Sequence, residues 1–380
     1  MDLGLSEEQN MLRNMVGKVC DEYASLTQLR EQEGKPQGFS SEFWQQLGEL
    51  GLTGINVPEN YGGLGMGALD GVFLAEQFGR ALAVSPHHVS SVLAADLIVK
   101  TGSPEQKDQW LSSIASGEKF VTVASSEAGR RDEIDGLQLR AEFQGEGLLL
   151  SGEKHFVPFA NTAEAILLLA RDTSGSILGV MLPREWIDSV GSALDCHYQI
   201  NHAQDALFKI RFNDCLVPVQ YLLNDGKCLW SQWQLSMARG LIPLAAYAVG
   251  AAERVNEISL EYAQYRKAFG RPIGGFQAIA HYLADSTVAV DGASTLVHQA
   301  AWSCDQGHDF QPLAMMAKLQ ACETFRRAAA LCIQVHGGIG YTTEADPQLF
   351  FRRAKQMQTL HYDSTTLERR IANHLFPVSA

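Results

Sequence analysis

The sequence predicts an α+β protein with a helical N-terminal domain, a middle antiparallel β-barrel or sandwich, and a C-terminal helical bundle. Helix-capping patterns occur in the first third of the chain, and short apolar segments separated by turn residues fill the middle third. In the last third, apolar residues recur at three- and four-residue spacing over many turns. We therefore expect three regions, residues 1–118, 119–222 and 223–380.

Two capping boxes predict helix starts in the first region. In "LSEEQ", Ser6 can accept a hydrogen bond from the backbone three residues on, and Gln9 can reach back to the cap. The stretch "SPEQKDQW" repeats this pattern from Ser103, with Pro104 at the first helical position. Gly117 is placed to end the second of these helices.

The segments that follow Phe120 have the composition of strands. "KFVTVASSE", "AEAILLLARD" and "SILGVMLPRE" are short and apolar, and Gly, Asp, Asn or Pro separate such segments. Because no helical pattern intervenes, their regular spacing favours an antiparallel barrel or sandwich. From Leu223 onward, long stretches such as "PLAMMAKLQACETFRRAAALCIQVH" suit a bundle of helices.

Composition excludes several function classes. The formal net charge of -13 argues against non-specific binding to nucleic acid or to anionic membranes. The 7 cysteines show no C-x-x-C spacing, so we expect a reduced compartment and neither disulfides nor a metal site. The polar start "MDLGLSEEQN" is no signal peptide, and the apolar run around Pro243 is too short to span a membrane. We therefore expect a cytoplasmic protein.

Two glycine-containing motifs in the last third have candidate binding residues. In "QVHGGIGY" (334–341), adjacent glycines can expose N–H groups to a phosphate, or can simply end a helix and form a turn. "YRKAFGRPIGGFQAIAHYLAD" (265–285) places Arg266, Lys267 and Arg271 beside an aromatic residue and glycines. These cations can bind phosphate, or can complement the dipole at a helix C-terminus.

Taken together, these segments resemble the acyl-CoA dehydrogenase family over nearly the whole chain. "VPENYGGLGMGALD" (57–70) is similar to the family's N-terminal glycine turn. The 265–285 segment is similar to its R-x-x-F-G-x-x-I/L-x-x-F-Q pattern, and the 334–341 segment to its Q-x-x-G-G-x-G-Y pattern. The resemblance implies an acyl-CoA dehydrogenase-like fold whose C-terminal domain is a four-helix bundle.

The same resemblance implies an activity and partners. Members of the family bind FAD and oxidise an acyl-CoA thioester between its α and β carbons. A carboxylate base takes the α proton, and the flavin takes a hydride from the β carbon. Electrons usually pass to an electron-transferring flavoprotein. The enzymes are commonly homotetramers in which each FAD lies between subunits.

On the ADP side of the cofactor, the chain keeps the family pattern. Six residues fall on it: Arg266, Phe269, Gln277, Gln334, Gly337 and Gly338. An arginine and backbone N–H groups facing a pyrophosphate make physical sense.

On the flavin side, the chain departs from the pattern. The family often reads E-P-G-A-G-S-D, whereas this chain reads "EAGRRDE" and keeps Glu127. Arg130, Arg131 and Asp132 replace small residues and a serine in that stretch. The family's W-I-T-N-G becomes "FVPFA", in which Phe156 can still stack on a flavin but Pro158 offers neither hydroxyl nor N–H.

The stretch "LHYDSTT" leaves the catalytic base open. Alignment without a gap from Arg352 places His361 on the family's glutamate, whereas a shift of two residues matches "YDST" to Y-E-G-T and selects Asp363. Some members have their glutamate on a helix after residue 230, where this chain has Gly240. A carboxylate and a neutral imidazole can both act as a base.

Three functional hypotheses follow from this unequal match. The first is an acyl-CoA dehydrogenase that forms a complete homo-oligomer. The second is a non-catalytic or FAD-completing subunit of a heteromeric enzyme, since "HYDSTTLERRIA" resembles subunits of two-gene acyl-CoA dehydrogenases, some of which act on bulky steroid-like thioesters. The third is an oxidase, or a nitro- or thiol-processing flavin enzyme, of the same fold.

Overall fold

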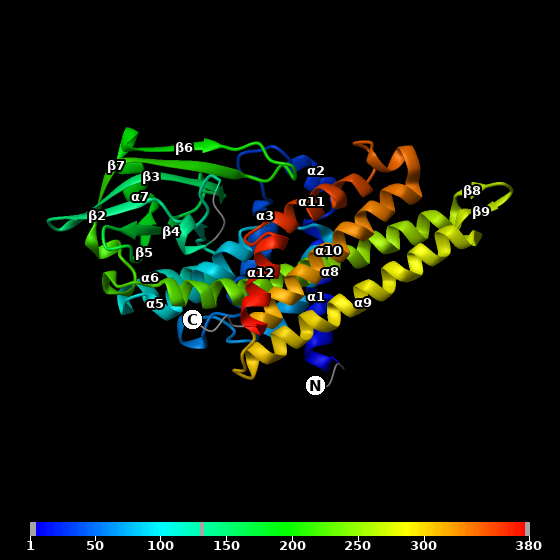
Figure 1. The fold of residues 1–380 in the computed structure, drawn as a ribbon, viewed down its shortest axis with the longest axis horizontal. Helices are drawn as coiled ribbons and strands as arrows, with labels where there is room; N and C mark the ends of the chain where they lie inside the picture. The colour runs from blue at the N-terminus through cyan, green and yellow to red at the C-terminus, as the bar shows by residue number, and fades with distance from the viewer. Residues whose placement is uncertain (1–4, 130–132, 377–380) are drawn as a thin grey trace. The chain divides into compact units, whose positions relative to one another are not determined.

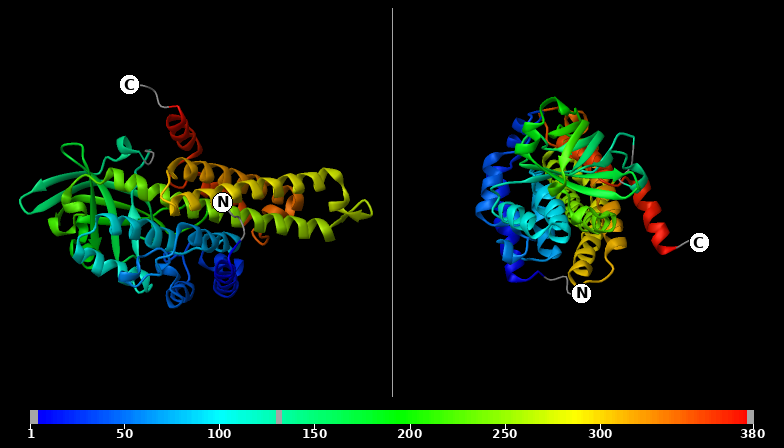
Figure 2. Two further views of the ribbon diagram at one scale, coloured as in Figure 1. Left: turned by 90° about the horizontal axis from the view of Figure 1, so that it is seen from below. Right: turned by 90° about the vertical axis from the view of Figure 1, so that its left-hand side faces the viewer.

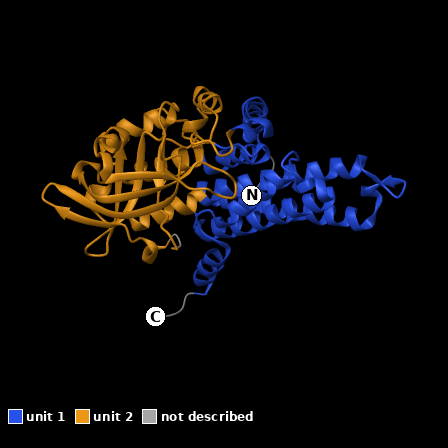
Figure 3. Ribbon diagram, turned by 90° about the horizontal axis from the view of Figure 1, so that it is seen from above, with its two compact units in different colours: residues 1–31, 67–84, 241–380 blue, residues 32–66, 85–240 orange. Residues whose placement is uncertain are grey.

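The computed structural model describes residues 5–129 and 133–376, which form two compact units. Unit 1 combines residues 1–31, 67–84 and 241–380, and unit 2 combines residues 32–66 and 85–240 (Figure 3). Each unit therefore brings together segments that are distant in the sequence. Arg130, Arg131 and Asp132, the predicted departures on the flavin side, lie outside the described residues.

Unit 1 is built mainly of helices. Its helices are α1 (Glu7–Tyr23), α2 (Leu26–Gln32), α4 (Ala68–Ala81), the second part of α8 (Trp230–Tyr265), α9 (Gln277–Asp305), α10 (Gln311–His336), α11 (Pro347–Thr359) and α12 (Ser364–Leu375). A short hairpin, β8 (Lys267–Ala268) with β9 (Arg271–Pro272), and the 3-10 helices η8 (Ile273–Gly275) and η9 (Gly337–Tyr341) complete it. Figures 1 and 2 show α8, α9 and α10 side by side, with the hairpin at one end of this bundle.

Two glycines let α4 and α8 touch backbone to backbone. A Cβ added at Gly79 of α4 would lie 1.9 Å from the carbonyl oxygen of Tyr247. A Cβ added at Gly250 of α8 would lie 1.9 Å from the carbonyl oxygen of Glu76. Because each glycine faces the backbone of the opposite helix, no side chain fits between the two helices at this crossing.

Unit 2 contains a mixed sheet and several helices. Its strands are β1 (Val121–Ala124), β2 (Arg140–Gln144), β3 (Gly147–Pro158), β4 (Ala165–Asp172), β5 (Ile177–Pro183), β6 (Leu194–Tyr198) and β7 (Leu207–Pro218). Its helices are α3 (Ser41–Glu49), the π-helix η3 (His88–Ala94), α5 (Ala95–Thr101), α6 (Pro104–Ala115), α7 (Arg184–Ser189) and the first part of α8. The 3-10 helices are η1 (Leu52–Gly54), η2 (Glu59–Tyr61), η4 (Ile134–Gly136), η5 (Gly191–Ala193), η6 (Val219–Tyr221) and η7 (Asn224–Gly226).

The sheet corrects one prediction. Its strand order is β1-β4-β2-β3-β7-β6, with β5 paired to β4. β4 runs parallel to both β1 and β2, whereas the other pairs are antiparallel. A purely antiparallel sheet was therefore the wrong expectation. Strand direction depends on which strands become neighbours, and composition does not specify that choice.

The predicted order of helices, strands and helices is confirmed. Ser6 and Ser103 both form the predicted capping boxes, with Gln9 and Gln106 as reciprocal partners. The longest helix, α8, passes by length and composition as a membrane span, but 78% of its most apolar window is buried inside the structure. Such burial is typical of a core helix. The expectation that this segment is too short to span a membrane was wrong, because the helix is 36 residues long.

Candidate functional site

The hairpin end of the bundle in unit 1 brings the ADP-side candidates together. Here α8 ends, α9 begins and α10 ends. The Tyr262 ring of α8 stacks on the His336 imidazole of α10, with ring centroids 4.0 Å apart. Tyr262 also packs with Ala263, Leu283 and Val335 in a buried cluster. This packing places the six candidates on the same end of unit 1: Arg266, Phe269, Gln277, Gln334, Gly337 and Gly338.

All six candidates are exposed, in keeping with a binding surface. Phe269 is 95% exposed and has a φ of 51°, which is unusual for a bulky residue. A Cβ at Gly337 or Gly338 would meet nothing within 4 Å, so their N–H groups can be approached closely. An exposed guanidinium and open backbone amides are groups that bind a pyrophosphate, so these residues fit the ADP half of FAD.

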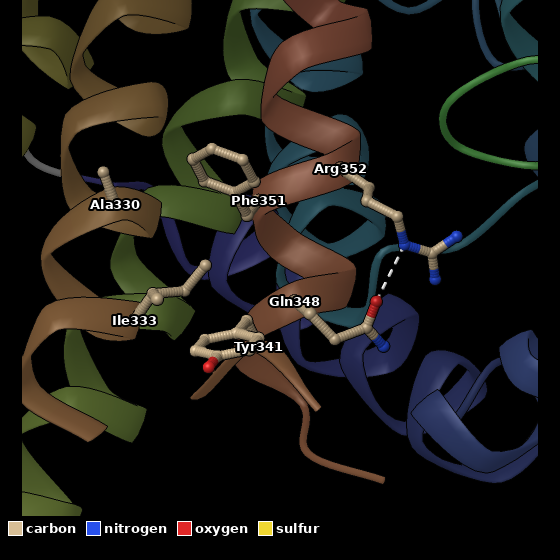
Figure 4. A pocket seen from close by; sticks show the side chains of 6 residues that line it. All are labelled: Ala330, Ile333, Tyr341, Gln348, Phe351 and Arg352. Carbon is tan, nitrogen blue, oxygen red and sulfur yellow. Dashed lines mark hydrogen bonds between the residues drawn. The ribbon is translucent and has the colours of Figure 1, made fainter. Parts of the chain in front are cut away.

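A pocket of about 420 Å³ lies in the same unit, between α10 and α11. Its lining residues are Ala330, Ile333, Tyr341, Gln348, Phe351 and Arg352. Figure 4 shows the apolar side chains facing the space between the two helices, and Arg352 Nε donates to Gln348 Oε1 at 2.8 Å. The sequence did not predict this pocket, because the motif at 334–341 contains only Tyr341 of its six lining residues.

The loop between α11 and α12 carries both candidate bases and is tied to α10. Lys318 of α10 is only 1% exposed. Its ammonium donates to the carbonyl oxygen of Tyr362 at 2.5 Å and lies 3.5 Å from that of Gln358, near the C-terminus of α11. A buried ammonium of this kind fixes the loop, because the charge requires these acceptors. The sequence analysis gave Lys318 no role.

The two candidate bases have different environments. Burial, together with the positive charge of Lys318, lowers the pKa of His361 to about 3. The imidazole is therefore neutral at pH 7 and holds a proton weakly. Asp363 is the N-cap of α12, and its Oδ1 accepts a hydrogen bond from the N–H of Thr366 at 2.8 Å. The carboxylate thus also stabilises a helix.

The alternative base position is closed in unit 2. A Cβ at Gly240 would lie 2.4 Å from Cδ2 of Leu93 and 3.6 Å from Cε1 of His88. Leu93 therefore fills the space into which a side chain at position 240 would extend.

On the flavin side, Glu127 is held inside unit 2. It forms an ion pair with Lys154, with Nζ and Oε1 2.6 Å apart, and the two side chains are 8% and 0% exposed. Its carboxylate also accepts hydrogen bonds from the N–H groups of Gln138 and Leu139, at 2.8 and 3.0 Å. Glu127 therefore orders its own loop, and any contact of this position with a cofactor would come through the backbone.

Phe156 is presented on the surface of unit 2 by an irregularity in β3. The register between β3 and β7 shifts between Lys154 and Val157. Phe156 has a φ of 54°, its side chain is exposed, and its N–H donates to Gln199 Oε1 at 2.7 Å. A left-handed conformation costs a bulky residue about 1–3 kcal/mol and is found most often at functional sites. Gln199 had no signal in the sequence.

Comparisons with known proteins identify the family. The model of the acyl-CoA dehydrogenase N-terminal domain matches residues 6–118, and that of the C-terminal domain matches residues 229–375. The chain is 32% identical over 367 residues to a probable acyl-CoA dehydrogenase, YngJ of Bacillus subtilis, covering 94% of this chain and 95% of that protein. The chain belongs to the acyl-CoA dehydrogenase family.

Two further relatives of this acyl-CoA dehydrogenase family member come from Mycobacterium tuberculosis. The acyl-CoA dehydrogenase FadE27 is 29% identical over 394 residues, which covers 99% of each chain. The crystal structure of the ChsE4–ChsE5 complex matches at a TM-score of 0.88 and 28% identity, with 100% of both chains covered.

The candidates of this acyl-CoA dehydrogenase family member thus fall into three groups. The ADP-side residues share one end of unit 1, His361 and Asp363 share one loop of unit 1, and Glu127 and Phe156 belong to unit 2. Within residues 5–129 and 133–376, no group of three or more His, Cys, Asp or Glu side chains is placed to hold a metal ion.

Proposed function

We propose that this chain is an FAD-dependent acyl-CoA dehydrogenase that desaturates an acyl-CoA thioester between its α and β carbons. The observation that carries the proposal is the convergence of the six exposed ADP-side residues on one end of unit 1. When bound, FAD supplies the hydride acceptor. Arg266 and the amides of Gly337 and Gly338 would hold its pyrophosphate, and Phe156 would stack on its isoalloxazine.

We assign the α-proton transfer to Asp363. Taking up the α proton would turn His361 into a cation, which burial and the positive charge of Lys318 both oppose, whereas a carboxylate becomes neutral when it takes up a proton. A carboxylate suits this step, and Lys318 orients the loop that presents it. His361 then serves to fill space and shape the loop, with a φ of 59°.

We further propose that the protein acts as an oligomer in the cytoplasm, in the breakdown of fatty or other acyl-CoA thioesters. Exposed apolar side chains near the ADP-side residues support a contact with a second chain: Tyr265, Phe269, Ile339 and Tyr341 are 68%, 95%, 53% and 70% exposed. The second chain is another copy of this protein or a different family member, and an electron-transferring flavoprotein takes up the electrons. The comparisons do not favour a non-catalytic subunit.

Flavin content and anaerobic bleaching test the proposal. The full chain, purified alone, is expected to hold about one FAD per protomer and to lose its flavin absorbance when an acyl-CoA is added without air. Absence of flavin until a second family chain is added would instead support the FAD-completing subunit. Peroxide formation without an electron-transferring flavoprotein would support an oxidase.

Two substitutions at position 363 separate the base from the helix cap. Asp363→Asn keeps a good N-cap but removes the base, whereas Asp363→Ala removes both. We expect Asp363→Asn to fold normally and to slow anaerobic bleaching about 100-fold or more. Bleaching by Asp363→Asn at the normal rate would exclude Asp363 as the base.

A further inference from the structure

The strained backbone at Phe156 is held by a chain of polar side chains. The Phe156 N–H donates to Gln199 Oε1 at 2.7 Å. The amide nitrogen of Gln199 lies 3.3 Å from Nδ1 of His155, and Nε2 of His155 lies 3.2 Å from Oε2 of Glu153. Within residues 5–129 and 133–376, the Gln199 side chain is thus the group that accepts from the amide of this left-handed residue.

The donor and acceptor pattern fixes the protonation of His155. A backbone N–H can only donate, so the oxygen of Gln199 must face Phe156 and its NH2 group must face His155. Nδ1 of His155 must therefore be an acceptor, and the proton of the neutral ring sits on Nε2, where it meets Glu153.

A second proton on His155 would break this pattern. Nδ1–H would then face the NH2 group of Gln199, and two donors would oppose each other. Rotating the Gln199 amide by half a turn would satisfy His155, but would place the NH2 group against the Phe156 N–H. In either orientation one hydrogen bond is lost, and with the rotated amide the strained residue loses its hydrogen bond to Gln199.

The charges around His155 are mixed. Glu153 lies beside the ring, and Lys209 and Arg211 of β7 each pair with Glu153 at 2.7 Å. Lys154 and Glu127 pair with each other, and Lys154 points to the opposite side of β3 because alternate residues face opposite sides of a strand. His155 itself is 12% exposed, so a proton can reach it from solvent.

We propose that Gln199 and His155 are positioning residues that hold Phe156 in its left-handed conformation, and that a second proton on His155 releases it. The functional consequence rests on the proposed role of Phe156 in stacking on the flavin. Under that role, the hydrogen-bonded chain of Gln199, His155 and Glu153, called the relay below, makes the position of the Phe156 ring depend on pH. His155 thereby acts on Phe156, the next residue in the chain, through the side chain of Gln199.

Hydrogen exchange of the Phe156 amide tests the proposal directly. It would be measured by mass spectrometry on the purified full chain, as a protection factor, between about pH 8 and about pH 5. Phe159 is an internal control, because it also has a positive φ of 53° but its N–H donates to the carbonyl of Ala206 at 2.8 Å, outside the relay. Gln199→Ala and Gln199→Glu would be compared with the unmodified chain.

The two variants make opposite predictions. In the unmodified chain, protection at Phe156 should fall about 10-fold as the pH is lowered, while protection at Phe159 stays constant. Gln199→Ala should be unprotected at Phe156 at both pH values. Gln199→Glu should keep its protection at low pH, because a carboxylate accepts from both the Phe156 N–H and a protonated His155.

Constant protection in the unmodified chain, or the same loss in Gln199→Glu, would overturn the proposal. Flavin content measured on the same samples reports on the proposed function separately. Normal exchange behaviour in a protein without flavin would support the positioning role and count against the proposed function. A flavin-loaded protein whose Phe156 protection does not respond to pH would support the proposed function and count against the positioning role.

Discussion

The crossing of α4 and α8 makes a strong prediction for Gly250→Ala. In an ordinary helix this substitution stabilises by about 1 kcal/mol, because alanine loses less backbone entropy. Here the new Cβ would lie 1.9 Å from the carbonyl oxygen of Glu76, well below the 3.0 Å that real Cβ contacts respect. The two helices must therefore move apart by about 1 Å, which forfeits a quarter to a half of each van der Waals contact across the crossing.

We expect this separation to outweigh the gain in helix propensity. Overpacking of a close contact costs about 1–3 kcal/mol and sometimes more. After the gain of about 1 kcal/mol in helix propensity is subtracted, the net loss of unfolding free energy should be up to about 2 kcal/mol. Gly79→Ala, on the opposite helix, should behave alike because its Cβ would lie 1.9 Å from the Tyr247 carbonyl. The assay is urea unfolding followed by circular dichroism.

Gly292→Ala is the matched control. Gly292 is an exposed residue inside α9, and a Cβ there would meet nothing within 4 Å. It should therefore gain about 0.5–1 kcal/mol. If Gly250→Ala and Gly292→Ala shift the unfolding free energy in the same direction, the backbone contact between α4 and α8 does not exist as described.

Three further perturbations test other parts of the structure. Lys154→Met should lower the unfolding free energy by about 3 kcal/mol in urea unfolding, because it leaves the buried Glu127 carboxylate without its cation. Adding Glu127→Gln should recover part of this loss. No recovery in the double variant would contradict the ion pair. Burial lowers the pKa of His87 from 6.5 to about 4, so the unfolded chain binds more protons and stability falls as the pH drops through that window, by about 2 kcal/mol between about pH 7 and about pH 5. His87→Gln should flatten this pH dependence, and an unchanged slope would refute the assignment. In Phe269→Asn the new asparagine tolerates the positive φ, so the unfolding free energy of the protomer should change by no more than about 0.5 kcal/mol. The variant should bind FAD more weakly or form fewer oligomers in sedimentation runs. Unchanged assembly and flavin content would contradict the role of this surface.

Local chemistry explains which parts of the fold were predictable. The capping boxes at Ser6 and Ser103 involve residues three positions apart, so the sequence pattern contains all the information they need. The parallel pairing of β1 with β4 depends on contacts between segments more than 40 residues apart along the chain, such as Val121 with Ala165. No local pattern encodes that choice.

The candidate site also contains residues that a local motif indicates and residues that only long-range contacts define. The ADP-side candidates could be selected from the sequence because they lie in two continuous motifs, at 265–285 and 334–341. Gln199 could not, because it supports Phe156 from a segment 43 residues away. Lys318 resembles any lysine on a helix surface until tertiary packing buries it and supplies the Tyr362 carbonyl as its partner.

Helix α10 fixes the distance between Lys318 and the ADP-side candidate Gln334. Lys318 fixes the loop with Asp363, and Gln334 of the same helix stands at the ADP-side end, about 24 Å further along at 1.5 Å per residue. A single inserted or deleted residue between them would rotate one group relative to the other by about 100° and shift it by about 1.5 Å. The spacing between the loop with the candidate base and the ADP-side candidates is therefore set by the number of residues in one helix, which tolerates substitutions along its exposed face but not a change in length.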